Sequence, residues 1–209
     1  MEANTEAFLK AARKIAARVP NVRFAAAAFK ESQAELVRGA VAEAGVPVDV
    51  HVSRTPELIH AADCCLACSG SVSLELLYHA KPSVILYRIS RFAYFVQSIF
   101  RKVRYITLVN LMTADDPFTG RPAGVYDPAE PRDAHVLVPE YLTCEDRSEQ
   151  LAGHCVEWLT DAAARSRRVA ELAALRDRCG QGGASQRAAE YIVRELTGRT
   201  ASRSRASAA

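Results

Sequence analysis

Apolar positions along this chain follow two spacings, one typical of helices and one typical of buried strands. Helical spacing, as at Phe8, Ala12 and Ile15, recurs between capping residues and helix breakers. It predicts helices over 5–18, 31–44, 55–61, 72–80, 147–159, 162–179 and 185–196. Short apolar runs predict strands over 22–29, 48–52, 64–68, 84–87, 105–109 and 135–139. Strands separated by helices of about 8–15 residues predict a Rossmann-like α/β fold with a mainly parallel sheet and flanking helices.

The segment 91–104 does not fit this alternation of strands and helices, because it combines apolar and basic residues and contains no acid. One stripe of its helical wheel holds five apolar residues, namely Phe92, Phe95, Val96, Ile99 and Val103. A basic amphipathic helix with aromatic residues can lie on an anionic membrane surface. Alternatively, the stripe packs on the sheet while the basic ends stay in solvent. Both hold if the outer aromatics Tyr94 and Phe100 stay exposed.

The predicted elements form one domain over 1–196, ending in a helical segment. Within it, 113–133 is rich in proline and glycine and predicts a long loop. Loops of more than ~15 residues are usually functional or disordered. The tail 197–209, rich in Arg, Ser and Ala, is expected to be disordered.

Composition is that of a soluble globular protein, with 49% hydrophobic and 24% charged residues. The formal net charge of +3 is supplied by three arginines of the tail 197–209. Basic and acidic residues in the remainder of the chain therefore balance, which argues against a nucleic-acid partner. No signal peptide is visible, and no apolar run reaches the ~18–20 residues needed to span a bilayer, so we expect a cytoplasmic protein. The clustered cysteines Cys64, Cys65 and Cys68 indicate small buried hydrophobes. Neither cysteines nor histidines have metal-site spacing, so we expect no metal and no cofactor.

The main candidate for chemistry is the turn Ser69-Gly70-Ser71 between a predicted strand and a predicted helix. In an open parallel sheet such a turn lies at the carboxyl ends of the strands, where ligands bind. Small residues let backbone N–H groups approach a ligand, and a helix N-terminus favours phosphate. Glu75, in the first turn of that helix, can accept hydrogen bonds from a sugar hydroxyl beside the phosphates. The alternative is an ordinary turn in which Ser69 or Ser71 caps the helix.

Another candidate is Asn110, which follows the predicted strand 105–109. At the carboxyl end of a parallel strand its side chain can reach the ligand of the Ser-Gly-Ser turn. A turn-forming role is the alternative.

Six short motifs, taken in order and spacing, resemble those of lipid-A-disaccharide synthase, an inverting glycosyltransferase of the two-domain GT-B architecture. They are Ser69-Gly70-Ser71 with Leu74-Glu75, Lys81-Pro82, Tyr87-Arg88, Leu108-Val109-Asn110-Leu111, Val138-Pro139-Glu140, and Gly183-Ala184-Ser185 before Ala188-Ala189. The resemblance extends over about residues 4–196. It concerns the carboxyl-terminal half of that family, the nucleotide-sugar-binding domain.

The resemblance implies transfer of 2,3-diacylglucosamine from its UDP form to 2,3-diacylglucosamine 1-phosphate, which yields lipid A disaccharide and UDP. It implies seven substrate-binding residues, namely Ser69, Gly70, Ser71, Glu75, Arg88, Asn110 and Glu140. The first three would contact the diphosphate, and Glu75 the ribose. Arg88 and Asn110 would face the donor side of the cleft, and Glu140 would border the donor pocket. No metal is implied, because helix N-termini and basic groups would stabilise the leaving UDP.

The sequence also departs from the family pattern. The amino-terminal domain, which holds the acceptor site and the base, is absent, as are the linking strand and its Gly-Ser-Arg loop, so no catalytic residue is assigned. The loop 113–133 is longer than usual, and Thr143 stands where glutamine is typical. We therefore expect a truncated product or one subunit of a split enzyme, inactive alone. Expected partners are an amino-terminal domain in trans or a second copy through 186–196.

Acyl-chain substrates favour the membrane-surface interpretation of 91–104 and thus peripheral association with the inner membrane. Two other classes of function stay open. One is half of a UDP-N-acetylglucosamine 2-epimerase or of a murein-precursor transferase. The other is a non-catalytic subunit that binds a UDP-sugar or docks on the membrane.

Overall fold

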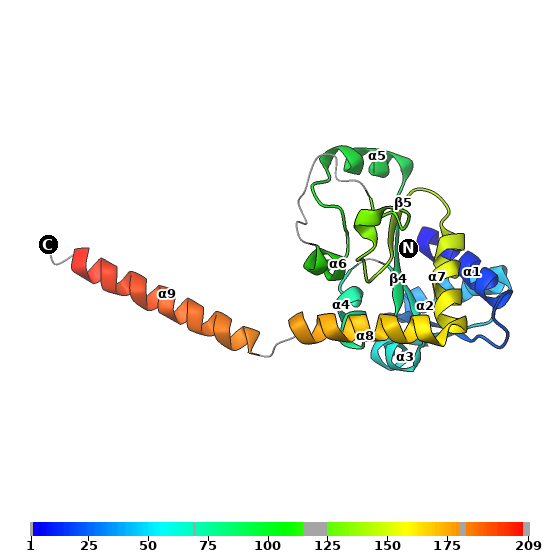
Figure 1. The fold of residues 1–209 in the computed structure, drawn as a ribbon, viewed down its shortest axis with the longest axis horizontal. Helices are drawn as coiled ribbons and strands as arrows, with labels where there is room; N and C mark the ends of the chain where they lie inside the picture. Colours follow the sequence, from blue (N-terminus) through cyan, green and yellow to red (C-terminus); the bar gives the residue numbers. More distant parts are fainter. Residues whose placement is uncertain (1, 69, 115–124, 180–182, 207–209) are drawn as a thin grey trace. The chain divides into compact units, whose positions relative to one another are not determined.

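The fold was analysed in a computed structural model that describes residues 2–68, 70–114, 125–179 and 183–206 (Figure 1). The chain forms two compact units, Met1–Ala174 and Leu175–Ala209. The strands found in the described residues all belong to the first unit. The candidate site therefore has to be built from that unit.

The described residues include five strands: β1 (Phe24–Ala28), β2 (Val48–Val52), β3 (Cys65–Cys68), β4 (Ser83–Arg88) and β5 (Glu140–Thr143). They form a two-stranded sheet, β1-β2, and a three-stranded sheet in the order β3-β4-β5. Every pairing is parallel, which confirms the predicted α/β class. The strands divide into two sheets, whereas the sequence suggested one.

Most helices lie within a few residues of their predicted ranges. In the first unit they are α1 (Glu2–Ala16), α2 (Glu31–Ala44), α3 (Thr55–Ala61), α4 (Val72–Tyr78), α5 (Arg91–Phe100), α6 (Leu108–Thr113), the short 3-10 helix Pro131–Asp133 and α7 (Ser148–Thr160). Helix α8 (Ala162–Cys179) follows. Part of the predicted loop 113–133, at 115–124, lies outside the described residues.

The strand predicted at 105–109 is wrong, because this segment enters α6 instead. The hydroxyl of Thr107 accepts a hydrogen bond from the backbone N–H of Asn110 and so caps the helix. The backbone N–H groups of Ile106 and Thr107 donate to the carboxylate of Glu140, at 2.5 and 2.9 Å. Since a side chain satisfies these donors, they are not available to a neighbouring strand.

The strand predicted at 135–139 is also displaced, since β5 starts at Glu140. The side-chain amide of Asn110 occupies both backbone groups of Val138: its Nδ2 donates to the carbonyl at 2.7 Å, and its Oδ1 accepts from the N–H at 3.2 Å. Val138 therefore pairs with a side chain rather than with a strand. The ladder begins one residue later, where Ile85 N–H donates to the carbonyl of Pro139 at 2.8 Å.

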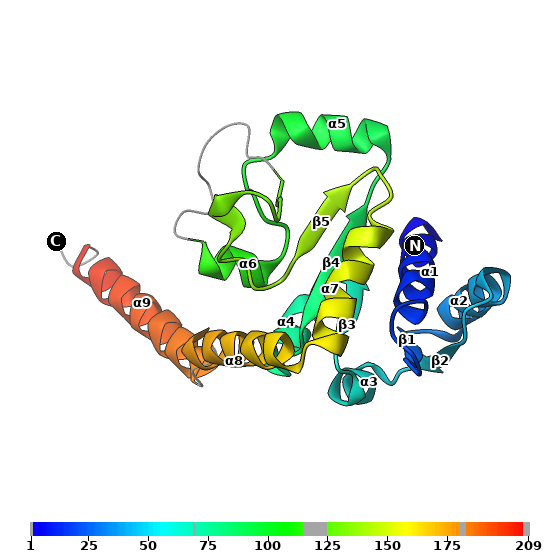
Figure 2. The ribbon, with the colours of Figure 1, turned by 45° about the vertical axis from the view of Figure 1, so that its right-hand side comes forward.

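The main core lies between the three-stranded sheet and the helices α1 and α7, both of which contact β4 (Figure 2). It is formed by small and aliphatic residues around one tryptophan, including Ala11, Ile15, Val84, Leu86, Leu151 and Trp158. Helix α4 lies on the other side of β4 in Figure 1, where it contacts β3 and α6. At the carboxyl ends of the strands, the first turn of α1 reaches β3 and β4, where the side chain of Asn4 donates to Cys68 Sγ and accepts from the N–H of Arg88.

The orientation of α5 corrects one of the two interpretations of 91–104. No residue of α5 is buried, and Phe92, Phe95 and Ile99 are 77%, 62% and 55% exposed. The stripe therefore does not pack on the sheet. Among the described residues, no helix is both long and apolar enough to cross a bilayer.

In the second unit, α9 (Ala184–Ala206) continues past residue 196, where we expected the helix to end and a disordered tail to begin. Residues 207–209 lie outside the described part of the chain. The apolar residues at 191–193 are more than half exposed, and Arg194 lies over the ring of Tyr191 at 5.4 Å. Pairing of this helix with a second copy stays a prediction.

The packing of β4 leads to a stability prediction. Leu86 is fully buried between the sheet and α1 and α7, so Leu86→Ala should lower the free energy of unfolding by about 2–5 kcal/mol. Leu36→Ala is the matched control, since Leu36 is 55% exposed on α2 and should change stability by less than about 0.5 kcal/mol. Urea unfolding measures both, and equal losses would contradict the described core.

Candidate functional site

The parallel register of β3, β4 and β5 places their carboxyl ends along one edge of the sheet. Cys68, the last residue of β3, pairs with Leu86, and Arg88, the last of β4, pairs with Thr143 at the end of β5. Neighbouring strands lie about 4.8 Å apart, so segments leaving these ends come within about 10 Å of one another. Ligands of open α/β sheets bind at this edge.

The turn after β3 is open to solvent at the residues that the structure describes. Ser69 lies outside them, whereas Gly70 and Ser71 are exposed. Gly70 has a φ of +139°, a conformation that residues with a side chain rarely adopt. A Cβ at this position would meet nothing within 4 Å, so glycine is required by the backbone conformation and not by crowding.

The start of α4 does not have the usual side-chain cap. The hydroxyl of Ser71 makes no capping hydrogen bond, which weakens the alternative of an ordinary capped turn. The buried hydroxyl of Ser73 instead donates to the carbonyl of Gly70 at 2.9 Å and so fixes the turn from inside. Glu75 follows in the first turn and is half-buried. Among the described residues, none donates a hydrogen bond to its carboxylate, which is therefore free to accept one from a ligand.

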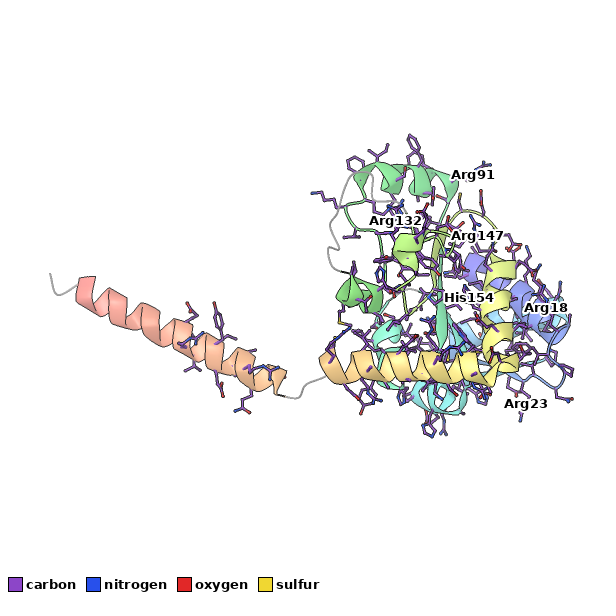
Figure 3. The ribbon with its side chains drawn as sticks, viewed as in Figure 1. Arg18, Arg23, Arg91, Arg132, Arg147 and His154 are labelled. Atoms are coloured by element: carbon purple, nitrogen blue, oxygen red, sulfur yellow. The ribbon has the colours of Figure 1, made fainter. Side chains whose placement is uncertain are left out.

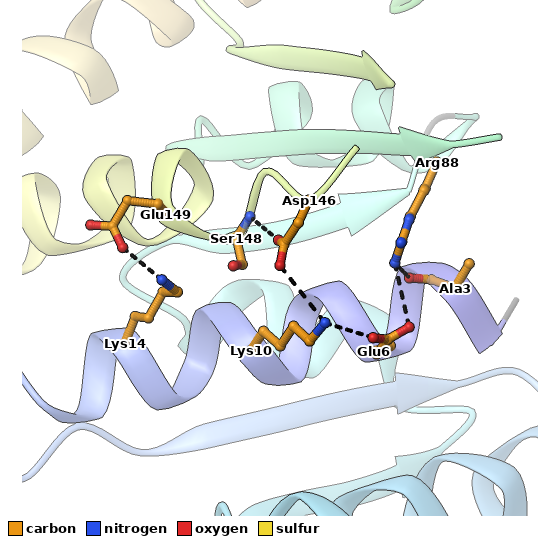
Figure 4. A network of polar contacts seen from close by, with 8 residues as sticks. All are labelled: Ala3, Glu6, Lys10, Lys14, Arg88, Asp146, Ser148 and Glu149. Atoms are coloured by element: carbon orange, nitrogen blue, oxygen red, sulfur yellow. Dashed lines mark hydrogen bonds and ion pairs between the residues drawn. The ribbon is translucent and has the colours of Figure 1, made fainter. Parts of the chain in front are cut away.

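Arg88 is the last residue of β4 at this edge, but it is hydrogen-bonded to residues of α1 (Figure 4). Its backbone N–H donates to Asn4 Oδ1 at 3.0 Å. Its guanidinium donates to the carboxylate of Glu6 and to the carbonyl of Ala3, both at 3.4 Å. The same helix is fixed to the start of α7 by Lys10 and Lys14. A ligand contact of Arg88 would have to compete with this network.

Asn110 and Glu140 are brought together, but inside the protein. They are 0% and 2% exposed, and Asn110 Nδ2 donates to the Glu140 carboxylate at 3.0 Å. Thr107 adds a hydroxyl donor to the same carboxylate at 2.6 Å. Burial raises the pKa of Glu140, and these donors together with two backbone N–H groups offset part of that rise. In this conformation the pair holds the segment before α6 against β5.

A cavity of about 210 Å³ opens at the carboxyl end of β5, on the side of α5. Tyr94, Tyr126 and Tyr141 line it together with Thr143 and Arg147. Figure 2 shows α5 beyond the carboxyl ends of β4 and β5, so the cavity lies between this helix and the sheet edge. Aromatic walls beside a cation and a few polar groups are typical of sites for small polar ligands. Sequence reasoning missed these tyrosines, of which Tyr141 directly follows the quoted Val-Pro-Glu motif.

A second cavity, of about 230 Å³, lies between α7, α8 and the segment before β5. His154, labelled in Figure 3, lines it. Its ring is hydrogen-bonded to the hydroxyl of Tyr141 at 2.8 Å and stacked on Trp158. Burial lowers the pKa of His154 to about 4, so the ring is neutral at neutral pH. Arg168 donates to the carbonyls of Val136 and Leu137 at 3.1 and 2.8 Å. This cavity lies away from the strand ends.

A buried ion pair joins Arg104 to Asp133, which lines the second cavity. The guanidinium donates to both carboxylate oxygens, and Tyr105 donates its hydroxyl to the same carboxylate at 2.7 Å. The backbone N–H of Asp127 adds a hydrogen bond of 2.8 Å. Burial alone would raise the pKa of Asp133, but these four donors lower it below its ordinary value. The cluster fixes the segment around Tyr126, which lines both cavities.

Metal and thiol chemistry find little support in the described residues. No three of their His, Cys, Asp or Glu side chains lie close enough together to hold a metal ion. All six cysteines are free thiols. Cys64, Cys65 and Cys68, predicted to be buried, are half-buried. Desolvation still raises the pKa of Cys65 to about 12, which keeps this thiol protonated.

Comparison with known proteins identifies the family. A family model described as lipid-A-disaccharide synthetase matches residues 1–118, more than half of the chain. The chain belongs to this family. The match confirms the resemblance seen in the motifs up to Asn110, whereas Glu140 lies beyond the matched range.

Members of the lipid-A-disaccharide synthetase family extend the similarity further along the chain. A lipid-A-disaccharide synthase of Myxococcus xanthus is 27% identical over 188 residues, which cover 90% of this chain and 44% of that relative. One of an Anaeromyxobacter species is 30% identical over 140 residues, covering 67% of this chain and 31% of the relative. One of Geobacter sulfurreducens is 24% identical over 188 residues. The chain thus spans less than half the length of these relatives.

The ion pair inside this family domain leads to a pH prediction. Because the folded pKa of Asp133 lies below its ordinary value of 3.8, its stabilisation is present above that value and lost as the pH falls below it. Asp133→Asn should lower the free energy of unfolding at pH 7 by about 3 kcal/mol, as for one partner removed from a buried pair. The variant should also lose less stability than the wild type between pH 5 and pH 2.

Denaturant unfolding at several pH values measures this difference. Asp49→Asn is the matched control, because it removes the same charge from a surface pair with Arg23. Parallel pH profiles for the wild type and Asp133→Asn would contradict the assigned role.

Proposed function

We propose that this chain is the nucleotide-sugar-binding half of a lipid A glycosyltransferase. The donor would be UDP-2,3-diacylglucosamine and the acceptor 2,3-diacylglucosamine 1-phosphate, giving the lipid A disaccharide and UDP. We assign the general base that an inverting transfer needs to no residue of this sequence. Turnover would then require an amino-terminal domain supplied with this chain or in trans, and the chain alone would bind the donor without reaction.

The observation that supports the proposal most directly is the exposed turn at the sheet edge in a chain of this family. Gly70 and Ser71 are open to solvent directly after β3, and the carboxylate of Glu75 has no hydrogen-bond donor among the described residues. Backbone N–H groups of the turn would bind the diphosphate, with Ser69 as a further contact. The carboxylate would accept hydrogen bonds from the ribose hydroxyls. Nothing in this arrangement requires a metal.

The other residues expected to bind the donor, Arg88, Asn110 and Glu140, differ in whether a ligand could reach them. Arg88 would reach the donor side only by exchanging its bonds to α1, and Asn110 and Glu140 are buried against each other. We propose that Asn110 and Glu140 act by positioning the segment 106–110 beside α4, which α6 contacts. The tyrosine-lined cavity at the end of β5 is the proposed place for the sugar or base of the donor.

We further propose that α5 docks on the inner-membrane surface. Its exposed apolar residues are Phe92, Phe95, Val96, Ile99 and Phe100, and the segment from 88 to 104 contains five basic residues and no acid. Apolar side chains would enter the headgroup region while Arg91 and Lys102, the exposed basic residues of this segment, pair with anionic lipids. Such docking would bring the sheet edge close to substrates whose acyl chains stay in the bilayer.

The assignment of Glu75 can be tested by UDP binding to the full chain. Glu75→Ala should weaken UDP binding by about 1–3 kcal/mol, the cost of leaving buried ribose hydroxyls without an acceptor. Glu57→Ala is the matched control, because Glu57 lies in the first turn of α3 and is exposed. Isothermal calorimetry measures both, and an unchanged affinity for Glu75→Ala would remove the ribose role.

The docking of α5 can be tested with vesicles of phosphatidylglycerol and phosphatidylcholine. The double variant Phe95→Ser/Ile99→Ser should partition at least about tenfold more weakly, because both side chains lose apolar area. Leu36→Ser removes a similarly exposed apolar residue from α2 and should bind like the wild type. Vesicle sedimentation gives the partition coefficients. Equal partitioning of all three proteins would argue against docking through α5.

A further inference from the structure

The helix α5 is oriented with its polar side toward the protein. Four positions at helical spacing are the less exposed ones, namely Tyr94, Gln97, Ser98 and, just after the last helical residue, Arg101. The apolar residues occupy the opposite, exposed side. A surface helix normally has the reverse orientation, because burial of its apolar stripe stabilises it. The side of α5 that faces the protein therefore carries hydrogen-bonding groups, of which Tyr94 lines the cavity at the sheet edge.

Several of these groups are buried without a partner. Arg101 is 9% exposed, and its Nε and Nη1 have no hydrogen-bond partner among the residues that the structure describes. Within the described part of the chain, Gln97 Oε1 on the preceding turn and Nη1 of Arg104 are likewise without a partner, while the other two nitrogens of Arg104 donate to Asp133. A buried guanidinium without acceptors costs several kcal/mol, so native proteins almost always supply one. The unmet donors point to a ligand that brings the acceptors.

Two described carboxylates of this region, those of Asp133 and Glu145, already have hydrogen-bond or ion-pair partners. Asp133 accepts from Arg104, Tyr105 and the backbone of Asp127. Glu145, which lines the cavity under α5, pairs with Arg147 at 3.0 Å. The acceptor for Arg101 therefore does not come from these carboxylates.

The unmet groups match the chemistry of a phosphate monoester. Three guanidinium nitrogens of Arg101 and Arg104 offer donors for phosphate oxygens. Gln97 Oε1 offers an acceptor, which the P–O–H of a monoanionic phosphate or a sugar hydroxyl can fill. Tyr94, on the same side of α5, lines the cavity of about 210 Å³ at the sheet edge. The remainder of a small ligand has room there.

We infer that the polar side of α5 is a binding site for a phosphate monoester, with the guanidinium of Arg101 as its main anchor. Arg104 Nη1 supplies a second cationic donor, and Gln97 accepts a hydrogen bond from the ligand. The phosphate belongs to a phosphorylated sugar or to a lipid headgroup, which present the same group. This site is separate from the UDP site proposed at Gly70, and either can exist without the other.

The test uses thermal unfolding and calorimetry of the full chain with three probes: inorganic phosphate, glucosamine 1-phosphate and dihexanoyl phosphatidic acid below its aggregation concentration. At least one probe should raise the Tm of the wild type. Arg101→Met should have a higher Tm than the wild type without ligand, because an unpaired buried charge is removed. It should bind the active probe at least about tenfold more weakly. Arg23→Met, which removes the same charge from an exposed residue outside α5, should behave like the wild type.

The pattern of probes identifies the source of the phosphate. A response to glucosamine 1-phosphate alone assigns the site to a phosphorylated sugar, and one to the phosphatidic acid alone assigns it to a lipid headgroup. Equal responses to all three show that the phosphate group suffices. Arg101→Lys keeps the charge without the planar fork and should retain part of the affinity. The inference is overturned if no probe stabilises the wild type, or if Arg101→Met keeps the full response.

Because the readouts use no UDP and no vesicles, failure here leaves the proposed glycosyl-transfer function untouched. Conversely, loss of UDP binding in Glu75→Ala would say nothing about Arg101.

Discussion

Parallel pairing of β3, β4 and β5 is the constraint on which the arrangement of this chain depends. It sends three segments out along one edge of the sheet: the turn at Gly70, the segment after Arg88 that leads into α5, and the residues after Thr143. Helices α1 and α7 contact β4 from one side and α4 contacts β3. The first turn of α1 bonds to Cys68 and Arg88 at this edge, and the exposed turn at Gly70 and the tyrosine-lined cavity, to which α5 contributes Tyr94, lie beside it.

Periodicity predicted the elements whose stability comes from their own apolar pattern, and it failed where side chains replaced the backbone ladder. The runs that became β4 and α7 are buried as their spacing indicates. The segment 105–109 has an equally apolar pattern, yet its N–H groups bond to the Glu140 carboxylate, and Asn110 takes both backbone groups of Val138. Such partners lie about 30 residues apart and leave no local signal.

The same limit applies to the candidate site. The small residues of the turn and the acid at Glu75 could be identified because their significance is local. That Arg88 would bond to α1, 82 residues away at Glu6, could not. The pattern of 91–104 predicted an amphipathic helix but not which side would face the protein. Its orientation depends on what lies underneath, which here is the polar end of a sheet rather than its apolar side.

The central claim is that backbone N–H groups of the turn after β3 bind the diphosphate of UDP. A ¹H–¹⁵N correlation spectrum of the full chain, recorded during a UDP titration, tests it most directly. The account predicts the largest saturable shifts at the amides of Gly70, Ser71 and the first turn of α4 through Glu75. Saturable shifts confined to other parts of the chain, with these amides unmoved, would contradict it.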